Sequence, residues 1–540
     1  IFANMKLKFQ TLVCLFVFAG IFSHCTQKEK RKLPAIAGDV DPNIPQQIEP
    51  ASILKFDSSR ANQFFSAFPL LENIKADWYD FYRNRNYSFA WSDTSGFTQA
   101  AQNLHNRINN LTDDGLDDSL YYRTEFNHIY DDASSLPGKD RKDSIYILNE
   151  MMLTAQYFMY TRQIYGALSA KQLKELGWNI TPKKISYPEY LNSILSGADS
   201  GIFSKEPIYP QYGYLKDYLK KYKAIDSSGG WPKVDTAIKK LSPGDSSVKI
   251  VAIKKRLAMS GDFKSADTSY IYDSTLANAV KEFRLRVGLK PANYIDRYVV
   301  HEMNVPVSKR IEQIIVNMER CRWIPISLGE NYIVVNIPDY KLFVYEDGKL
   351  NFSIDVVVGQ DATKTVIFND TLRTIAFSPY WNVPYSIYKN EMEGRLSETY
   401  LKRNNMEIVG NGRVRQLPGP NNSLGLVKFL FPNSYNIYFH DTPAKDKFNY
   451  TNRAFSHGCI RLKEPKKLAM YLLRNELSYT EKVIDSLMHL TKEVQVKLKQ
   501  PEPVYIGYLT AFVNSETGEL NFRKDIYNRD EEILKRLIKK

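Results

Sequence analysis

The segment from residue 440 to residue 461 gathers the side chains that nucleophilic catalysis needs. It holds a thiol, two imidazoles and two guanidinium groups, in a chain with only seven histidines. His440 ends a run of β-type residues, and fifteen residues separate it from Ser456-His457-Gly458-Cys459-Ile460-Arg461. A free cysteine of pKa ~8.5 is only about 3% thiolate at pH 7, and an imidazole that takes its proton can make the thiolate dominant. We therefore predict that Cys459 is a nucleophile and His440 its base.

The residues around this cysteine suit the later steps of the same chemistry. Gly458 lets the backbone approach a bound carbonyl, and the amides of Gly458 and Cys459 could cradle an oxyanion, at ~3 kcal/mol per donor. Ser456 and His457 are expected to order the loop and polarise the site. Arg461 is a fixed cation, suited either to a carboxylate or to holding the loop.

Two other interpretations of these residues are open. The first is a set of buried histidines and a cysteine without chemistry, which a polar, glycine-bearing and compact cluster disfavours. The second is a zinc site formed by His440, His457 and Cys459. Neither a fourth ligand nor a catalytic glutamate stands at a familiar spacing. We therefore expect no metal and no cofactor.

The pattern of apolar residues changes once along the chain. Helical spacing, as at Ile145, Leu148 and Met152, characterises residues 52–240 and again 246–305. From Tyr332 onward β-branched and aromatic runs predict strands, with a hairpin turn at Glu346-Asp347-Gly348. Helical patterns return after the cysteine motif. The sequence thus predicts helical domains before a β-rich catalytic domain.

Length, composition and charge limit the class of protein. The chain has 540 residues, too many for one core, with 43% hydrophobic and 25% charged residues, which is ordinary for globular proteins. The net charge of +13 fits a solvated basic surface or an anionic partner, and no nucleic-acid module is evident. Of four cysteines, only Cys321 and Cys459 lie beyond the leader, so a disulfide scaffold is excluded.

The leader predicts export. Lys6 and Lys8 precede an uncharged, mostly apolar run over residues 9–22, which Ser23-His24-Cys25 ends. We expect a signal peptide or lipoprotein leader over 1–25, with lipidation of Cys25, and a tether over 26–51. Simple cleavage and an uncleaved anchor remain open alternatives.

The cysteine motif, with His440 and the fifteen-residue gap, resembles the signature of the L,D-transpeptidase (YkuD-type) catalytic domain. Further segments resemble the large multidomain periplasmic branch of that family. They are Asn317-Met318-Glu319-Arg320, Tyr380-Trp381-Asn382-Val383-Pro384, residues 415–422, Phe431-Pro432-Asn433, Gly229-Gly230-Trp231-Pro232 and residues 522–527. The resemblance covers roughly residues 55–530.

The resemblance implies a multidomain α+β architecture with a mixed β-sandwich catalytic domain. The implied parts are an α-helical scaffold over 52–240, a small peptidoglycan-binding-like domain over 246–305, a connecting helix over 306–330, a catalytic domain over 331–510 with a capping lid at 385–431, and a C-terminal segment over 511–540. Trp381 and Asn422 are expected to line the substrate cleft.

The resemblance also implies the activity, which is peptidoglycan L,D-transpeptidation through a Cys459 thioester, with release of D-alanine and formation of 3→3 cross-links. The implied partners are stem peptides and glycan, a membrane reached through the leader or a lipid anchor, and carbapenem β-lactams as covalent inhibitors. The implied location is the periplasm of a Gram-negative bacterium. Hydrolysis of the same acyl-enzyme, as in an L,D-carboxypeptidase or endopeptidase, and a non-catalytic wall-binding lipoprotein stay open, as does glycan binding by the small helical domain.

Overall fold

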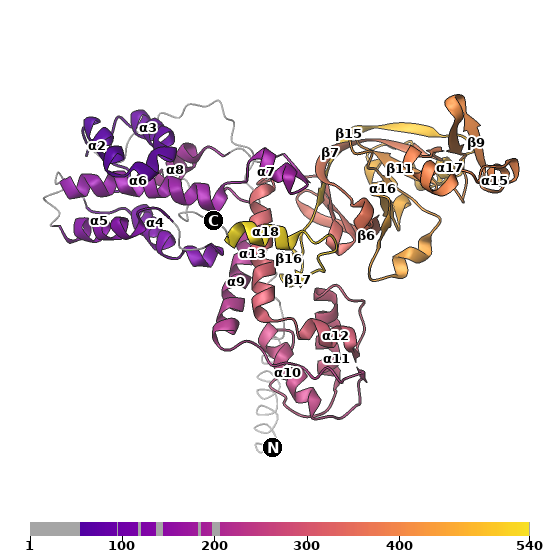
Figure 1. The fold of residues 1–540 in the computed structure, drawn as a ribbon, viewed down its shortest axis with the longest axis horizontal. Coiled ribbons are helices and arrows are strands. Elements are labelled where there is room, and N and C mark those ends of the chain that lie inside the picture. Colours follow the sequence, from indigo (N-terminus) through magenta and orange to yellow (C-terminus); the bar gives the residue numbers. More distant parts are fainter. Residues whose placement is uncertain are drawn as a thin grey trace, which may run out of the picture.

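The structure, a computed structural model, describes residues 54–93, 95–116, 120–136, 144–181, 185–196 and 206–538. Helical units come first in the chain and a β-rich unit follows, so the protein is a multidomain α+β chain (Figure 1). The predicted leader, the lipidation site Cys25 and the tether lie outside the described residues. Within these ranges, no helix combines the length and the hydropathy that crossing a bilayer requires.

The first helical unit packs around helix α6 (Ser144–Tyr165), most of whose side chains are buried. Its apolar residues occupy every side of the helix rather than one stripe, and such a helix must be surrounded. Glu150, in its centre, accepts hydrogen bonds from the amides of Ala90 and Trp91 and from the Tyr82 hydroxyl. The other helices whose side chains share this core are α2 (Ser59–Ala67), α3 (Lys75–Asn84), α4 (Gln99–Asn109), α5 (Arg123–Ser135), α8 (Tyr187–Leu195) and α9 (Gln211–Ser227).

A second, smaller helical unit has its own core. Its helices are α10 (Lys249–Ser260), α11 (Ser274–Arg286) and α12 (Arg297–Met303), and a two-strand ribbon of β2 (Lys240–Leu241) and β3 (Ile295–Asp296) closes it. Each of α11 and α12 begins at an aspartate whose carboxylate accepts a hydrogen bond from an amide of the first turn, Asp273 and Asp296.

Helix α13 (Val307–Trp323) connects the helical units to the β-rich unit. It packs along α9, and its Arg322 donates to the Ile164 carbonyl at 2.8 Å. At its end Trp323 packs edge-on against Trp178, with ring centroids 5.3 Å apart. The end of this helix is therefore fixed against the β-rich unit.

The β-rich unit is a mixed sheet with the strand order β1-β7-β11-β12-β14-β6-β5-β4-β15. Its long strands β7 and β15 also pair with each other, so the two layers expected for a sandwich are joined and the sheet closes on itself. The strands are β4 (Tyr332–Asn336), β5 (Lys341–Glu346), β6 (Lys349–Gly359), β7 (Ile367–Phe377), β11 (Val427–Leu430), β12 (Phe439–His440), β13 (Ala454–Ser456), β14 (Ile460–Leu462) and β15 (Val494–Gly507). Helices α16 (Pro465–Leu472) and α17 (Glu481–Met488) pack on it.

Two boundaries differ from the sequence prediction. Strand β1 (Trp178–Asn179), within the predicted scaffold, pairs with β7 at the sheet edge. It follows helix α7 (Ala170–Glu175), and a two-residue strand leaves no periodicity in the sequence. Strand β11, within the predicted lid, is a central strand of the sheet, since it pairs with both β7 and β12.

The segment predicted as a lid, together with the two-residue strand before it, carries a small sheet of its own, at the end of the molecule opposite the first helical unit (Figure 1). Its strands run in the order β8-β10-β9, and short helical segments surround them. These elements are β8 (Trp381–Asn382), α14 (Tyr385–Ile387), η5 (Tyr388–Met392), α15 (Glu398–Arg403), β9 (Met406–Val409) and β10 (Arg413–Gln416).

The C-terminal segment returns to the middle of the molecule. Strands β16 (Ala511–Val513) and β17 (Leu520–Phe522) form a hairpin whose apolar side chains join the core of the first helical unit. Helix α18 (Asp530–Ile538) lies against α13. The residues between them contact the β-rich unit, so this segment touches all the parts that meet at α13.

Candidate active site

Strand register brings the predicted nucleophile and base to one face of the sheet. Strands β12 and β14 run parallel, with His440 opposite Arg461 and Phe439 opposite Ile460. Since side chains alternate along a strand, Tyr438 and His440 share a face with Cys459 and Arg461. The buried residues Phe439 and Ile460 point into the core behind them.

The hydroxyl of Ser456 holds the turn that carries Cys459. It donates to the Cys459 carbonyl at 2.5 Å and accepts from the Gly458 amide at 3.1 Å. Gly458 has a φ of +114°, which a residue with a side chain rarely adopts. The expectation that the Gly458 amide cradles an oxyanion is therefore wrong for this conformation, because Ser456 already occupies that donor. Within the described chain the amide of Cys459 donates no hydrogen bond and is available.

The Cys459 sulfur lies among polar atoms of the segment that leads into β12. The thiol donates to the Asn436 carbonyl at 3.5 Å, and the side chain is half-buried. Burial is the main influence and raises the pKa of Cys459, although the amide and hydroxyl of Tyr438 lower it. Tyr438 was missed in the sequence analysis. Its position two residues before His440, on the same strand face, is the signal that could have identified it.

His440 is buried and held by the backbone beside it. Its Nδ1 lies 2.5 Å from the Asp441 carbonyl oxygen. Burial, with the nearby Arg461 cation, lowers the pKa of His440 to about 3, despite opposing contacts to the carbonyls of Asp441 and Leu424. The thiol bonds to Asn436 rather than to this imidazole. The thiolate–imidazolium pair expected from the sequence is thus not the favoured resting state, which is a neutral thiol beside a neutral imidazole.

The pH dependence of thiol reactivity tests this resting state. Because the pKa of Cys459 is raised, its alkylation by iodoacetamide should accelerate about tenfold per pH unit through the neutral range. Since His440 is neutral above about pH 3, its protonation should add no step between pH 5 and 8. Rates measured by intact mass across this range check the slope. A plateau at neutral pH would show an ion pair instead.

Arg461 is a half-buried cation beside the nucleophile. Its Nε is buried and lacks a hydrogen-bond partner among the described residues. Burial lowers its pKa, while the Cys459 sulfur favours its charge. Of the two roles considered in the sequence analysis, holding the loop by hydrogen bonds has no support in this conformation. A guanidinium without a carboxylate partner can receive one from a ligand.

His457 links the cysteine loop to the lid. Its Nε2 lies 3.1 Å from the Glu391 carboxylate in η5, and both side chains are about half exposed. The imidazole therefore points toward the lid and does not join His440 and Cys459 in a ligand set. Throughout the described ranges, no three histidine, cysteine or acidic side chains gather in a way that would hold a metal ion.

The two predicted cleft residues differ. Trp381 is half-buried on β8, at the base of the lid. Asn422 is buried, and its amide is used internally: Nδ2 donates to the carbonyls of Pro379 and Leu417, and Oδ1 accepts from the Leu424 amide. The structure gives Asn422 the role of fixing the lid, because no polar atom of its side chain is left for a substrate.

The join between lid and sheet is tight at Gly425, which has a φ of +63°. A Cβ there would lie 2.4 Å from the Asp441 carboxylate. We expect Gly425→Ala to lower the free energy of unfolding by about 2–4 kcal/mol, measured by urea denaturation. Gly394→Ala is the control, since Gly394 also has a positive φ but nothing lies within 4 Å of its Cβ position. Equal losses in the two variants would show that the contact with Asp441 adds nothing.

Residues 330–495 match the model of the L,D-transpeptidase catalytic domain, and residues 76–219 match that of a scaffold domain. This chain carries an L,D-transpeptidase catalytic domain. The sheet around His440 and Cys459 is thus the core of that domain, and the first helical unit contains its scaffold partner.

The individual relatives match this chain over only part of its length. A Haemophilus influenzae protein, whose own L,D-transpeptidase assignment is provisional, is 31% identical over 273 residues, which are 46% of this chain and 55% of that protein. The chain thus spans about half the length of this curated relative.

The solved structures show weaker likeness. The L,D-transpeptidase of Xylanimonas cellulosilytica is 14% identical and covers 50% of this chain and 98% of its own, with a TM-score of 0.18. The L,D-transpeptidase LdtMt1, solved with imipenem, is 14% identical over 33% of this chain and 59% of its own, also at 0.18. Both TM-scores lie below 0.5, too low to assign a fold or a site to this chain.

Proposed function

We propose that the protein is a peptidoglycan L,D-transpeptidase that forms 3→3 cross-links through a thioester on Cys459. The observation that supports this most is the strand register, which sets a thiol, an imidazole and a guanidinium on one face of an L,D-transpeptidase catalytic domain.

Acylation would begin when substrate binding excludes water and brings the donor peptide against the thiol. His440 takes the thiol proton, and the sulfur attacks the amide carbonyl of the third stem residue, meso-diaminopimelate. The negative oxygen of the tetrahedral intermediate lies on the free Cys459 amide. The C–N bond then breaks, D-alanine leaves with the proton from His440, and the acyl group remains as a thioester.

The resting protonation state fits this order of events. A neutral imidazole can accept a proton, whereas an imidazolium cannot, so the lowered pKa of His440 keeps the base competent. The raised pKa of Cys459 keeps the thiol unreactive until the proton is removed. Arg461 would receive a substrate carboxylate, since its guanidinium has a buried, unpaired Nε.

Deacylation decides between synthesis and hydrolysis. The side-chain amine of a second stem peptide would attack the thioester, releasing the thiol and closing the cross-link. Water on the same thioester would give a tripeptide.

Peptidoglycan sacculi should be incubated with the full chain, digested with a muramidase and analysed by mass spectrometry. 3→3 dimers are the expected products. Tripeptide monomers alone would show a hydrolase, and unchanged muropeptides a wall-binding protein without catalysis.

The setting of this reaction follows from its substrate. Stem peptides and glycan lie outside the cytoplasmic membrane, so we propose a periplasmic location, with membrane attachment through the leader or a lipid on Cys25. We also propose that carbapenems acylate Cys459, because their strained amide mimics the donor. LdtMt1, whose structure was solved with imipenem, motivates that choice of probe.

A further inference from the structure

A hydrogen bond to its carbonyl oxygen fixes the orientation of the peptide bond between Gly458 and Cys459. The Gly458 carbonyl accepts a hydrogen bond from Thr365 Oγ1 at 2.8 Å. In a trans peptide the C=O and the N–H point in opposite directions, and the described chain contains no cis bond. The Thr365 hydroxyl therefore also sets the direction of the Cys459 amide, which points away from Thr365.

Thr365 is itself held in place by a second hydroxyl. Its Oγ1 accepts from the Gly359 amide at 2.9 Å, and its own amide donates to the Tyr527 hydroxyl at 3.2 Å. The Tyr527 hydroxyl in turn donates to the Gly359 carbonyl at 2.6 Å. Each hydroxyl thus donates one bond and accepts one. Both side chains are buried, so water cannot replace either partner.

Gly359, the last residue of β6, packs tightly against the turn that carries Cys459. A Cβ on Gly359 would lie 2.1 Å from the Thr363 carbonyl and 3.1 Å from the Gly458 Cα. Thr363 adds a further bond, from its hydroxyl to the Ser456 carbonyl at 3.0 Å. A change in the Thr365 hydrogen bonds would therefore be transmitted to the Cys459 amide.

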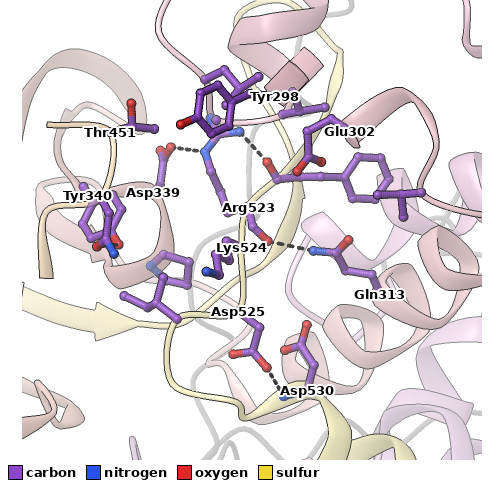
Figure 2. A pocket seen from close by; sticks show the side chains of 18 of the residues that line it. Tyr298, Glu302, Gln313, Asp339, Tyr340, Thr451, Arg523, Lys524, Asp525 and Asp530 are labelled. Atoms are coloured by element: carbon purple, nitrogen blue, oxygen red, sulfur yellow. Dashed lines mark hydrogen bonds and ion pairs between the residues drawn. The ribbon is translucent and has the colours of Figure 1, made fainter. Parts of the chain in front are cut away.

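Tyr527 belongs to the C-terminal segment. Figure 2 shows residues of this segment that precede and follow Tyr527 in sequence, Arg523, Asp525 and Asp530, with their hydrogen bonds and ion pairs. Before it, Arg523 pairs with Asp339 at 2.5 Å, and the Arg523 carbonyl accepts from Gln313 at 2.9 Å. After it, the Asp530 amide donates to Asp525 at 2.8 Å. These side chains line a cavity of about 1330 Å³ between α12, α13 and the β-rich unit. The segment reaches the cysteine turn from behind.

We propose that Thr365 and Tyr527 are positioning residues, which aim the Cys459 amide at the oxyanion of the acyl-transfer intermediate. The proposal rests on the proposed function and adds a role for the C-terminal segment to it. Neither residue touches the substrate, since both lie behind the turn. Their effect should appear only in steps that develop a negative oxygen.

Two reactions of the same thiol separate this role from a merely structural one. Acylation by imipenem passes through an oxyanion, whereas alkylation by iodoacetamide displaces iodide from a carbon and does not. Thr365→Val, which keeps the shape and removes the hydroxyl, should slow acylation about 10- to 100-fold and leave alkylation within about twofold. Thr365→Ser, which restores the hydroxyl, should recover most of the acylation rate.

Tyr527→Phe gives a second, milder variant in case Thr365→Val folds poorly, and should slow acylation about three- to tenfold. Tyr471→Phe is its control, because Tyr471 is buried in the same unit and its hydroxyl also donates to a backbone carbonyl, that of Tyr345 at 3.3 Å. Both rates are measured by intact mass on full chains, with thermal unfolding recorded for each.

The outcomes are distinct. Slowed acylation with unchanged alkylation supports the proposal. Acylation at the wild-type rate in Tyr527→Phe and in folded Thr365→Val would overturn it, and so would an equal loss of both reactions, which would show disturbance of the thiol itself. If the wild-type chain reacts with iodoacetamide but neither imipenem nor a tetrapeptide acylates it, the proposed function fails, and this role fails with it.

Discussion

Release of D-alanine from a tetrapeptide stem is expected to fall to the background rate in Cys459→Ala, a loss of at least about 10⁴-fold. The reason is chemical: the Cys459 sulfur is the atom that would form the thioester, and an alanine side chain has no nucleophile to replace it. Stability should hardly change, because the side chain is half-buried and its hydrogen bond to Asn436 is long, at 3.5 Å.

Cys321→Ala is the matched control, as it removes the other cysteine of the described chain. Cys321 is a buried residue of α13, so this variant should lose about 1–2 kcal/mol of stability and retain its activity. Residual D-alanine release above a few per cent in folded Cys459→Ala would show that the acyl transfer uses another group.

The second large effect is expected from His440→Asn. The asparagine amide can replace the bond from Nδ1 to the Asp441 carbonyl, but it cannot take a proton from the thiol. The kcat for D-alanine release should therefore fall about 10²- to 10⁴-fold, with little change in the thermal midpoint.

His489→Asn makes the same substitution in a comparable setting. His489 Nδ1 lies 2.7 Å from the Asp485 carbonyl, but on the exposed end of α17, far along the chain from the cysteine turn. Activity should be unchanged in this control. A loss of less than about threefold in His440→Asn would remove the imidazole from the mechanism and leave the Tyr438 hydroxyl as the group to test.

The sequence predicts the parts of the site that depend on residues close together in the chain, but not those that depend on strand pairing. His440 and Cys459 could be chosen as a candidate pair from the sequence, because a strand end and a glycine-bearing turn carry them and their residue types are rare in this chain. The register that sets them on one face could not be predicted, since it depends on the pairing of β12 with β14. The same register explains why Tyr438 was missed.

The protonation states of His440 and Cys459, and the partner of the Gly458 amide, could be obtained only from the structure. The sequence shows an imidazole near a thiol, but only burial reveals that His440 loses its positive charge and that Cys459 retains its proton. In the same way, the motif contains both Ser456 and Gly458, but only the geometry shows that the serine hydroxyl uses the glycine amide. Thr365 and Tyr527 lie about 90 and 70 residues from Cys459 in sequence, and no local pattern connects them.

The broad fold was predicted better than its boundaries. The change from helical to alternating periodicity near Tyr332 marks the start of β4 correctly. The resemblance implied a capping lid over 385–431, but residues 427–430 of that range form β11, a strand of the main sheet. The C-terminal hairpin joins the core of the first helical unit, a contact across some 300 residues that sequence patterns do not encode.

The central claim, acyl transfer through a thioester on Cys459, is tested most directly by intact-mass analysis of the full chain during turnover of a purified tetrapeptide. We expect a transient mass gain equal to the stem tripeptide acyl group, mapped by proteolysis to the peptide that contains Cys459, with free D-alanine released in equal amount at first. D-alanine release without any such adduct, or an adduct on another residue, would contradict it.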